Sequence, residues 1–121
     1  MYISVVSVFV NDIERALAFY VTKLGWEKRD DEPMDENMRW LTVAPAGEKT
    51  QFVLMKDQGN GQPVKVGGFS GIIIETDDVR KAHADLGQRG VEFSEAPVHQ
   101  PWGWWAQFKD SEGNEFGLHS P

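Results

Sequence analysis

The stretch "NDIERALAFY", residues 11–20, decides the fold of this 121-residue chain, because a strand pattern gives way there to a helical one. The preceding run, "YISVVSVFV", is rich in β-branched residues, whereas apolar residues after Asp12 recur at the spacing of an amphipathic helix. Asp12 stands at the expected N-cap, and Gly25 stands where a left-handed residue ends many helices. The pattern predicts a strand followed directly by a helix.

The chain carries a second version of this stretch, "DDVRKAHADL", residues 77–86. The alignment matches Asp12 with Asp78 and Ala16 with Ala82, and three short strand candidates follow each helix. A repeat period of about 65 residues is too long for a solenoid unit, so it predicts two copies of one βαβββ module.

A glycine-rich stretch, residues 57–68, separates the two copies and has the composition of a connection. We expect one domain over residues 1–121. Its first module covers about residues 1–57, its linker about 57–68 and its second module about 69–121.

Alternation along the strands assigns their two faces. In the first strand Val6, Val8 and Val10 share one face, opposite Val5, Ser7 and Phe9. A uniformly apolar row needs an amphipathic helix as its partner. The mixed rows are therefore expected to face a second sheet or a cavity.

Composition excludes several classes of function. The chain has no cysteine, which removes disulfides, thiolate nucleophiles and cysteine-based metal sites. Its net charge of −7 would repel a nucleic acid, and its apolar runs are too short to cross a membrane. We expect a cytoplasmic protein with neither partner.

Three segments, in this order and at this spacing, carry a resemblance to a known family. They are "VFVNDIERALAFYVTKLGWE" (residues 8–27), "TDDVRKAHADLGQRGVEF" (residues 76–93) and "FKDSEGNEFGL" (residues 108–118). The chain resembles the vicinal oxygen chelate superfamily of glyoxalases, bleomycin resistance proteins and extradiol dioxygenases. The resemblance implies an α+β fold in which two βαβββ modules form curved mixed sheets around a cup-shaped cavity. It also implies a homodimer.

Metal-using members of that family carry ligands at four cavity-facing positions. The resemblance places these positions at Val5, Val53, Gly71 and Gly117. Valine and glycine side chains offer no donor atom to a divalent ion, so we expect no metal and no cofactor. The resemblance therefore favours the binding branch of the family over its metal-dependent enzymes.

Aromatic residues are dense, with three tryptophans in "PWGWWAQF", residues 101–108. Alternation and the correspondence between modules predict a small-molecule pocket with an aromatic wall and a few polar groups. Its expected lining is Phe9, Trp40, Thr42, Val53, Met55, Glu75, Trp105, Gln107 and His119. The alternative, that the rings pack on one another or in a dimer interface, stays open. Trp102 and Trp104 are expected on a flap or an interface edge.

His119 has three interpretations: a polar residue near the chain end, a ligand contact, or a catalytic base oriented by Glu75 or Glu115. We expect His83 on a helix surface and His99 in a loop, without the spacing of a metal motif.

Three functions remain open at this point. The first is metal-free binding of a small apolar or aromatic molecule, and the second is a metal-independent or displaced-metal lyase or isomerase. In the third, the cup is filled by its own side chains and the domain acts only through association.

Overall fold

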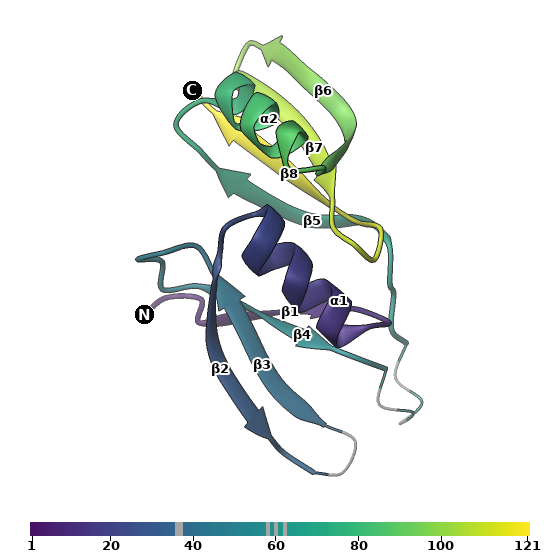
Figure 1. Cartoon of the computed structure of the whole chain (residues 1–121). Coiled ribbons are helices and arrows are strands. Elements are labelled where there is room, and N and C mark those ends of the chain that lie inside the picture. The colour runs from purple at the N-terminus through teal and green to yellow at the C-terminus, as the bar shows by residue number, and fades with distance from the viewer. Residues whose placement is uncertain (36–37, 58, 60, 62) are drawn as a thin grey trace. The chain divides into compact units, whose positions relative to one another are not determined.

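The computed structural model describes residues 1–35, 38–57, 59, 61 and 63–121. They belong to two compact units, Met1–Val66 and Gly67–Pro121, and each unit contains one four-stranded mixed sheet (Figure 1). Positions 58, 60 and 62 of the expected linker lie outside the described residues.

The first unit follows the predicted order of strand, helix and three strands. Its elements are β1 (Val5–Phe9), α1 (Ile13–Ala18), the π-helical turn η1 (Phe19–Lys23), β2 (Glu27–Pro33), β3 (Arg39–Ala44) and β4 (Gln51–Met55). The sheet order is β1-β4-β3-β2, with β1 parallel to β4 and the other pairs antiparallel. Asp12 caps α1 by accepting a hydrogen bond from the Arg15 amide at 3.0 Å, as the sequence predicts.

The helix of the first unit differs from the expected single α-helix, because its second half is π-helical. The Leu24 amide donates to the Phe19 carbonyl at 3.1 Å, which closes a wider turn. Phe19 and Tyr20 are adjacent in sequence, yet both are buried in this turn. Tyr20 packs on Trp26 at 5.4 Å and edge-on against Phe52 at 6.0 Å, so the wide turn supplies an aromatic core.

The second unit repeats the arrangement. Its elements are β5 (Gly68–Glu75), α2 (Val79–Gln88), β6 (Glu92–Gln100), β7 (Gly103–Lys109) and β8 (Asn114–Ser120). The sheet order is β5-β8-β7-β6, with β5 parallel to β8. Asp78 caps α2 through the amides of Arg80 and Lys81 at 3.0 and 3.2 Å. The prediction of an α+β fold with two βαβββ modules is confirmed.

Each helix covers one face of its own sheet (Figure 1). The residues under the helices, in the strands or directly after β1, are buried and apolar: Val8, Val10, Leu41, Val43, Phe52 and Leu54 in the first unit, and Ala106, Phe108, Phe116 and Leu118 in the second. The opposite faces carry the mixed rows, and the candidate site lies on the mixed face of the second unit.

One expectation about the second unit was wrong. Strand β6 reaches Gln100, so His99 lies in a strand and pairs with Trp104 instead of lying in a loop. Pro97 falls where the β6–β7 register shifts, between Glu95 and Val98, so its missing amide proton interrupts the ladder only where the pairing is already irregular. His83 is half-buried, because its ring packs edge-on against Phe93 at 4.5 Å.

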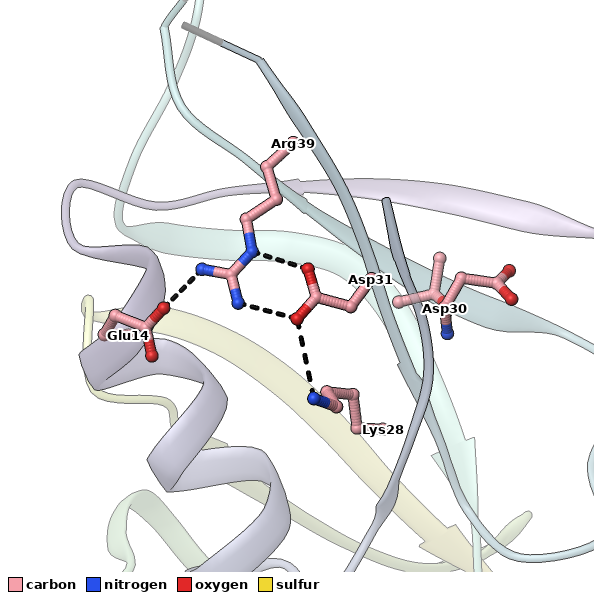
Figure 2. A network of polar contacts seen from close by, with 6 residues as sticks. Glu14, Lys28, Asp30, Asp31 and Arg39 are labelled. Carbon is pink, nitrogen blue, oxygen red and sulfur yellow. Dashed lines mark hydrogen bonds and ion pairs between the residues drawn. The ribbon is translucent and has the colours of Figure 1, made fainter. Parts of the chain in front are cut away.

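An ion-pair network joins β2, β3 and α1 in the first unit (Figure 2). The Arg39 guanidinium donates twice to the Asp31 carboxylate, at 2.7 and 2.8 Å, and once to Glu14. Lys28 adds a longer contact to Asp31 at 3.5 Å. The paired hydrogen bonds from Arg39 lower the pKa of Asp31 to about 2.

Candidate functional site

The second unit contains an open pocket of about 610 Å³ on the sheet face that turns away from α2. This volume lies in the range of small-molecule sites. All four strands of the sheet, and the turn between β6 and β7, contribute to the wall: Ile73, Glu95, Gln100, Trp102, Trp105, Gln107 and His119.

The Trp105 indole forms the floor of this pocket and lies over Gly117 of β8. An ideal Cβ on Gly117 would stand 2.2 Å from Trp105 Cη2 and under 3.0 Å from two further ring atoms. Such separations are far inside van der Waals contact. Only glycine at position 117 therefore leaves room for the ring in this place.

Trp102 forms a second aromatic wall and stands at the turn between β6 and β7. Its ring centroid lies 5.6 Å from that of Trp105, and the two planes meet at 81°. Edge-to-face packing at this distance is favourable, because the positive edge of one ring meets the negative face of the other. The two indoles form an aromatic corner.

His119 lies beside this corner with both ring nitrogens engaged. Nδ1 lies 2.6 Å from Glu75 Oε1, and Nε2 lies 3.0 Å from the Trp102 carbonyl oxygen. The imidazole also stacks on the Trp102 ring, with centroids 5.8 Å apart and planes at 30°.

These contacts favour the charged form of His119. A carbonyl and an ionised carboxylate can only accept, so a ring protonated at both nitrogens satisfies both neighbours. The hydrogen bond to the Trp102 carbonyl, and then the bond to Glu75, raise the pKa of His119 above its ordinary value.

Glu95 supplies a carboxylate to the opposite side of the pocket. It accepts a hydrogen bond from Trp105 Nε1 at 3.1 Å and pairs in register with Gln107. The indole N–H is thus satisfied, and the orientation of the ring is fixed by a second contact besides Gly117.

The structure divides the expected site residues between the two units. In the second unit Trp105, Gln107 and His119 line the pocket, and Glu75 holds His119. Glu115 pairs with Lys109 and with Phe69, and it does not line the pocket.

The remaining expected residues lie in the first unit. Phe9 pairs with Met55, and both are half-buried, as is Trp40. Thr42 and Val53 pair with each other and are buried, and the Thr42 hydroxyl accepts a hydrogen bond from the Asp30 amide at 2.9 Å.

Four lining residues were missing from the expected set: Ile73, Glu95, Gln100 and Trp102. Alternation along β5 places Ile73 on the same face as Glu75, so that residue could have been found. Glu95 and Gln100 lie in β6, whose pairing with β7 has two register shifts that alternation does not predict.

The four positions that correspond to family metal ligands have different surroundings. Val5 and Val53 are aliphatic, Gly117 lies under Trp105, and Gly71 has a φ of +77°, a conformation that favours glycine. Among the residues that the structure describes, no group of three His, Asp or Glu side chains could hold a metal ion. The same part of the chain contains no helix long and apolar enough to cross a membrane.

The duplicated βαβββ arrangement, with a pocket on the sheet face opposite the helix, defines the glyoxalase and bleomycin resistance class of α+β proteins. The chain belongs to the Glyoxalase/Bleomycin resistance protein/Dioxygenase superfamily, whose profile matches residues 2–118. The resemblance stated from the sequence is therefore confirmed.

Three relatives illustrate this membership. A superfamily member from Sphaerobacter thermophilus has a TM-score of 0.93 and 38% identity, covering 100% of this chain and 98% of that one. TnmS3, an antibiotic binding protein from Streptomyces sp. CB03234, has a TM-score of 0.84 and 37% identity, covering 100% and 96%. The protein YetH of Bacillus subtilis is 33% identical over 118 residues, which are 96% of this chain and 95% of YetH.

Proposed function

We propose that this protein binds a small planar aromatic or apolar molecule in the pocket of the second unit, without a metal ion. The observation that carries the proposal is the Trp105 indole, which occupies the space over Gly117. Metal-using relatives carry a ligand side chain at that position, whereas this chain presents an aromatic surface there.

The donor set does not fit a divalent ion. Such an ion needs several nitrogen or oxygen ligands that converge on one point. Two valines and two glycines supply no side-chain donor, and the nearby imidazole of His119 already contacts Glu75 and the Trp102 carbonyl.

The comparisons support a binding role. TnmS3, an antibiotic binding protein, shares 37% identity with this chain, and the match covers 100% of this chain and 96% of TnmS3. Burial of about 200 Å² of apolar ligand surface contributes about 5 kcal/mol before association costs, so stacking on the two indoles must supply part of the affinity.

A second candidate is a lyase or isomerase that works without the family metal or with a displaced one. The His119–Glu75 pair favours it, because a carboxylate 2.6 Å from an imidazole is the arrangement of an oriented base. The contact between Nε2 and the Trp102 carbonyl weighs against it, since a catalytic base needs a ring nitrogen that faces the substrate. Binding is therefore the stronger proposal.

Fluorescence titration with acridone, a neutral planar three-ring probe, tests the proposal. Trp105→Ala should weaken binding about 10-fold or more, because it removes the floor of the pocket. Trp104→Ala is the matched control, since the neighbouring ring lies 4.4 Å from the Arg80 guanidinium of α2, on the other face of the sheet. Equal affinities of Trp105→Ala and wild type would remove this pocket from the function.

Elemental analysis of protein purified without chelator tests the proposal that the protein holds no metal ion. We expect substoichiometric Ni, Zn, Fe and Mn. One tightly bound ion per chain would favour the displaced-metal enzyme.

We also propose a cytoplasmic homodimer. The family resemblance supports dimerisation, as do the exposed side chains of Phe69 and Val98 in the second unit. Sedimentation equilibrium tests it, and a single species with the mass of one chain would contradict it.

A further inference from the structure

Trp102 is the most exposed aromatic side chain of the pocket, with an exposed fraction of 57%. A ring with that much free surface has few packing contacts to fix its rotamer. It nevertheless stands edge-on to Trp105, and His119 of β8 contacts both its backbone carbonyl and its ring.

We infer that His119 is a positioning residue for ligand capture: it holds Trp102 against Trp105, so that the aromatic corner exists before the ligand arrives. The inference rests on the proposed function, because it assigns His119 a role in the same pocket. In this arrangement the ligand contacts the indoles of Trp102 and Trp105, and the His119 imidazole does not contact it.

Two kinds of contact act on Trp102 at once. The hydrogen bond from Nε2 fixes the backbone of the turn at the Trp102 carbonyl, at 3.0 Å, and the imidazole plane supports the indole. Glu75 orients the imidazole from β5 at 2.6 Å. A side chain held at its backbone and at its ring has little freedom left to lose on binding.

Gly103 allows the turn to approach His119 so closely. Its φ is +126°, and a Cβ there would lie 2.7 Å from His119 Nε2 and 2.4 Å from the Ser120 carbonyl oxygen. Glycine avoids both clashes. Gly103 therefore leaves the space that the hydrogen bond between His119 Nε2 and the Trp102 carbonyl requires.

His119 itself offers little to a ligand. Its side chain is 23% exposed, and both of its nitrogens face protein acceptors. A hydrogen bond to the ligand would require one of these contacts to break. The effect of His119 on affinity should therefore pass through Trp102.

A double-mutant cycle with acridone as the probe tests this dependence. His119→Ala should weaken binding about 5-fold, and Trp102→Ala should weaken it at least as much. The double variant should bind no more weakly than Trp102→Ala alone, because His119 has nothing left to position. His99→Ala is the matched control, since that histidine contacts Trp104 at 5.0 Å and does not line the pocket.

A spectroscopic readout without ligand separates this inference from the proposed function. The Trp102 and Trp105 indoles, whose centroids lie 5.6 Å apart, should give an exciton couplet in the far-ultraviolet circular dichroism spectrum, which subtraction of the Trp102→Phe spectrum isolates. The couplet should persist in wild type and His99→Ala and fall by about half or more in His119→Ala. His119→Gln should regain most of the couplet and affinity, because its amide can donate to the Trp102 carbonyl.

Each outcome decides one of the two proposals. A couplet unchanged in His119→Ala, affinity within about 2-fold of wild type, or additive losses in the cycle would overturn the positioning role. A wild-type protein that shows the couplet but does not bind acridone would contradict the proposed function and leave the positioning contact standing. If His119→Ala does not fold, Glu75→Ala replaces it, with the same expected loss of couplet and affinity.

Discussion

The Trp105 indole fills the space that a side chain on Gly117 would need: Trp105 Cη2 lies 2.2 Å from an ideal Cβ built on Gly117. Gly117→Ala should therefore displace the Trp105 ring. We expect acridone affinity to fall about 5-fold and the free energy of unfolding to fall by about 1–3 kcal/mol, the usual cost of overpacking. Fluorescence titration and urea unfolding measure the two effects.

Gly87→Ala provides the control for this substitution. Gly87 lies in α2, and a Cβ there has nothing within 4 Å. Alanine in a helix should leave affinity unchanged and raise stability by about 0.5–1 kcal/mol. If Gly117→Ala behaved like Gly87→Ala, the Trp105 ring would not need the space over Gly117.

The Asp31–Arg39 pair should make the stability of the first unit sensitive to acid. The folded pKa of Asp31 is lowered from 3.8 to about 2, so the folded state favours the ionised carboxylate. Its contribution is fully present above the unfolded pKa and is lost as the pH falls through about 2. Urea unfolding at several pH values should show a smaller loss of stability below pH 4 in Asp31→Asn than in wild type.

Lys28→Ala is the matched variant for this prediction. Lys28 approaches Asp31 only at 3.5 Å, and its side chain is 47% exposed, so solvent screens the pair. We expect the acid profile of Lys28→Ala to follow that of wild type. Parallel profiles for Asp31→Asn and wild type would show that Arg39 does not hold the carboxylate.

The fold could be predicted because its signals are local and occur twice. Asp12 and Asp78 cap helices that follow β-branched strands, and alternation along those strands gave the buried face. The π-helical turn at Phe19–Lys23 could not be predicted, because it arises when Phe19 and Tyr20 both pack into the core. The burial of both rings depends on tertiary packing, which a local sequence pattern does not reveal.

Only some of the site residues could be predicted from the sequence. Trp105 and His119 stand on regular strands, so counting along β7 and β8 placed them on the mixed face. Trp102 stands at a turn, and its position depends on a contact with His119, 17 residues later in the chain. Glu95 lies between register shifts of β6, where counting no longer gives the face.

The pKa of His119 should lie above the ordinary value for histidine. Its pKa is raised by the Trp102 carbonyl and then by Glu75 of β5, while Glu95 of β6 lines the same pocket. The stabilisation is fully present below the unfolded pKa, about 6.5, and is lost as the pH rises through the folded pKa. NMR titration of the His119 ring and unfolding at rising pH should report the same transition.

Glu75→Gln removes the negative charge from the Glu75–His119 contact but keeps a side chain that can form a hydrogen bond. A glutamine amide can donate to Nδ1, so a neutral ring protonated at Nε2 still donates to the Trp102 carbonyl. We expect the pKa of His119 to fall while the exciton couplet of Trp102 and Trp105 persists. An unchanged His119 pKa in Glu75→Gln would mean that the two side chains do not pair in solution.

Glu95 should set a charge preference among planar ligands. Its carboxylate lines the pocket and accepts from Trp105 Nε1, so a cationic ring system on the Trp105 face meets a negative charge. Glu95→Gln keeps an acceptor oxygen for the indole and removes the charge. Its affinity for 9-aminoacridinium should fall about 2- to 3-fold at low salt, because exposed charges contribute modestly, and its affinity for neutral acridone should not change.

Glu92→Gln is the control, because it removes the same charge from β6 at an exposed position outside the pocket. The difference between the two variants should shrink as ionic strength rises, since salt screens an exposed carboxylate. If Glu92→Gln reduced 9-aminoacridinium affinity as much as Glu95→Gln, the preference would follow the overall charge of −7 and not the pocket. If Glu95→Gln weakened acridone equally, the carboxylate would act by orienting Trp105 and not by attracting a cation.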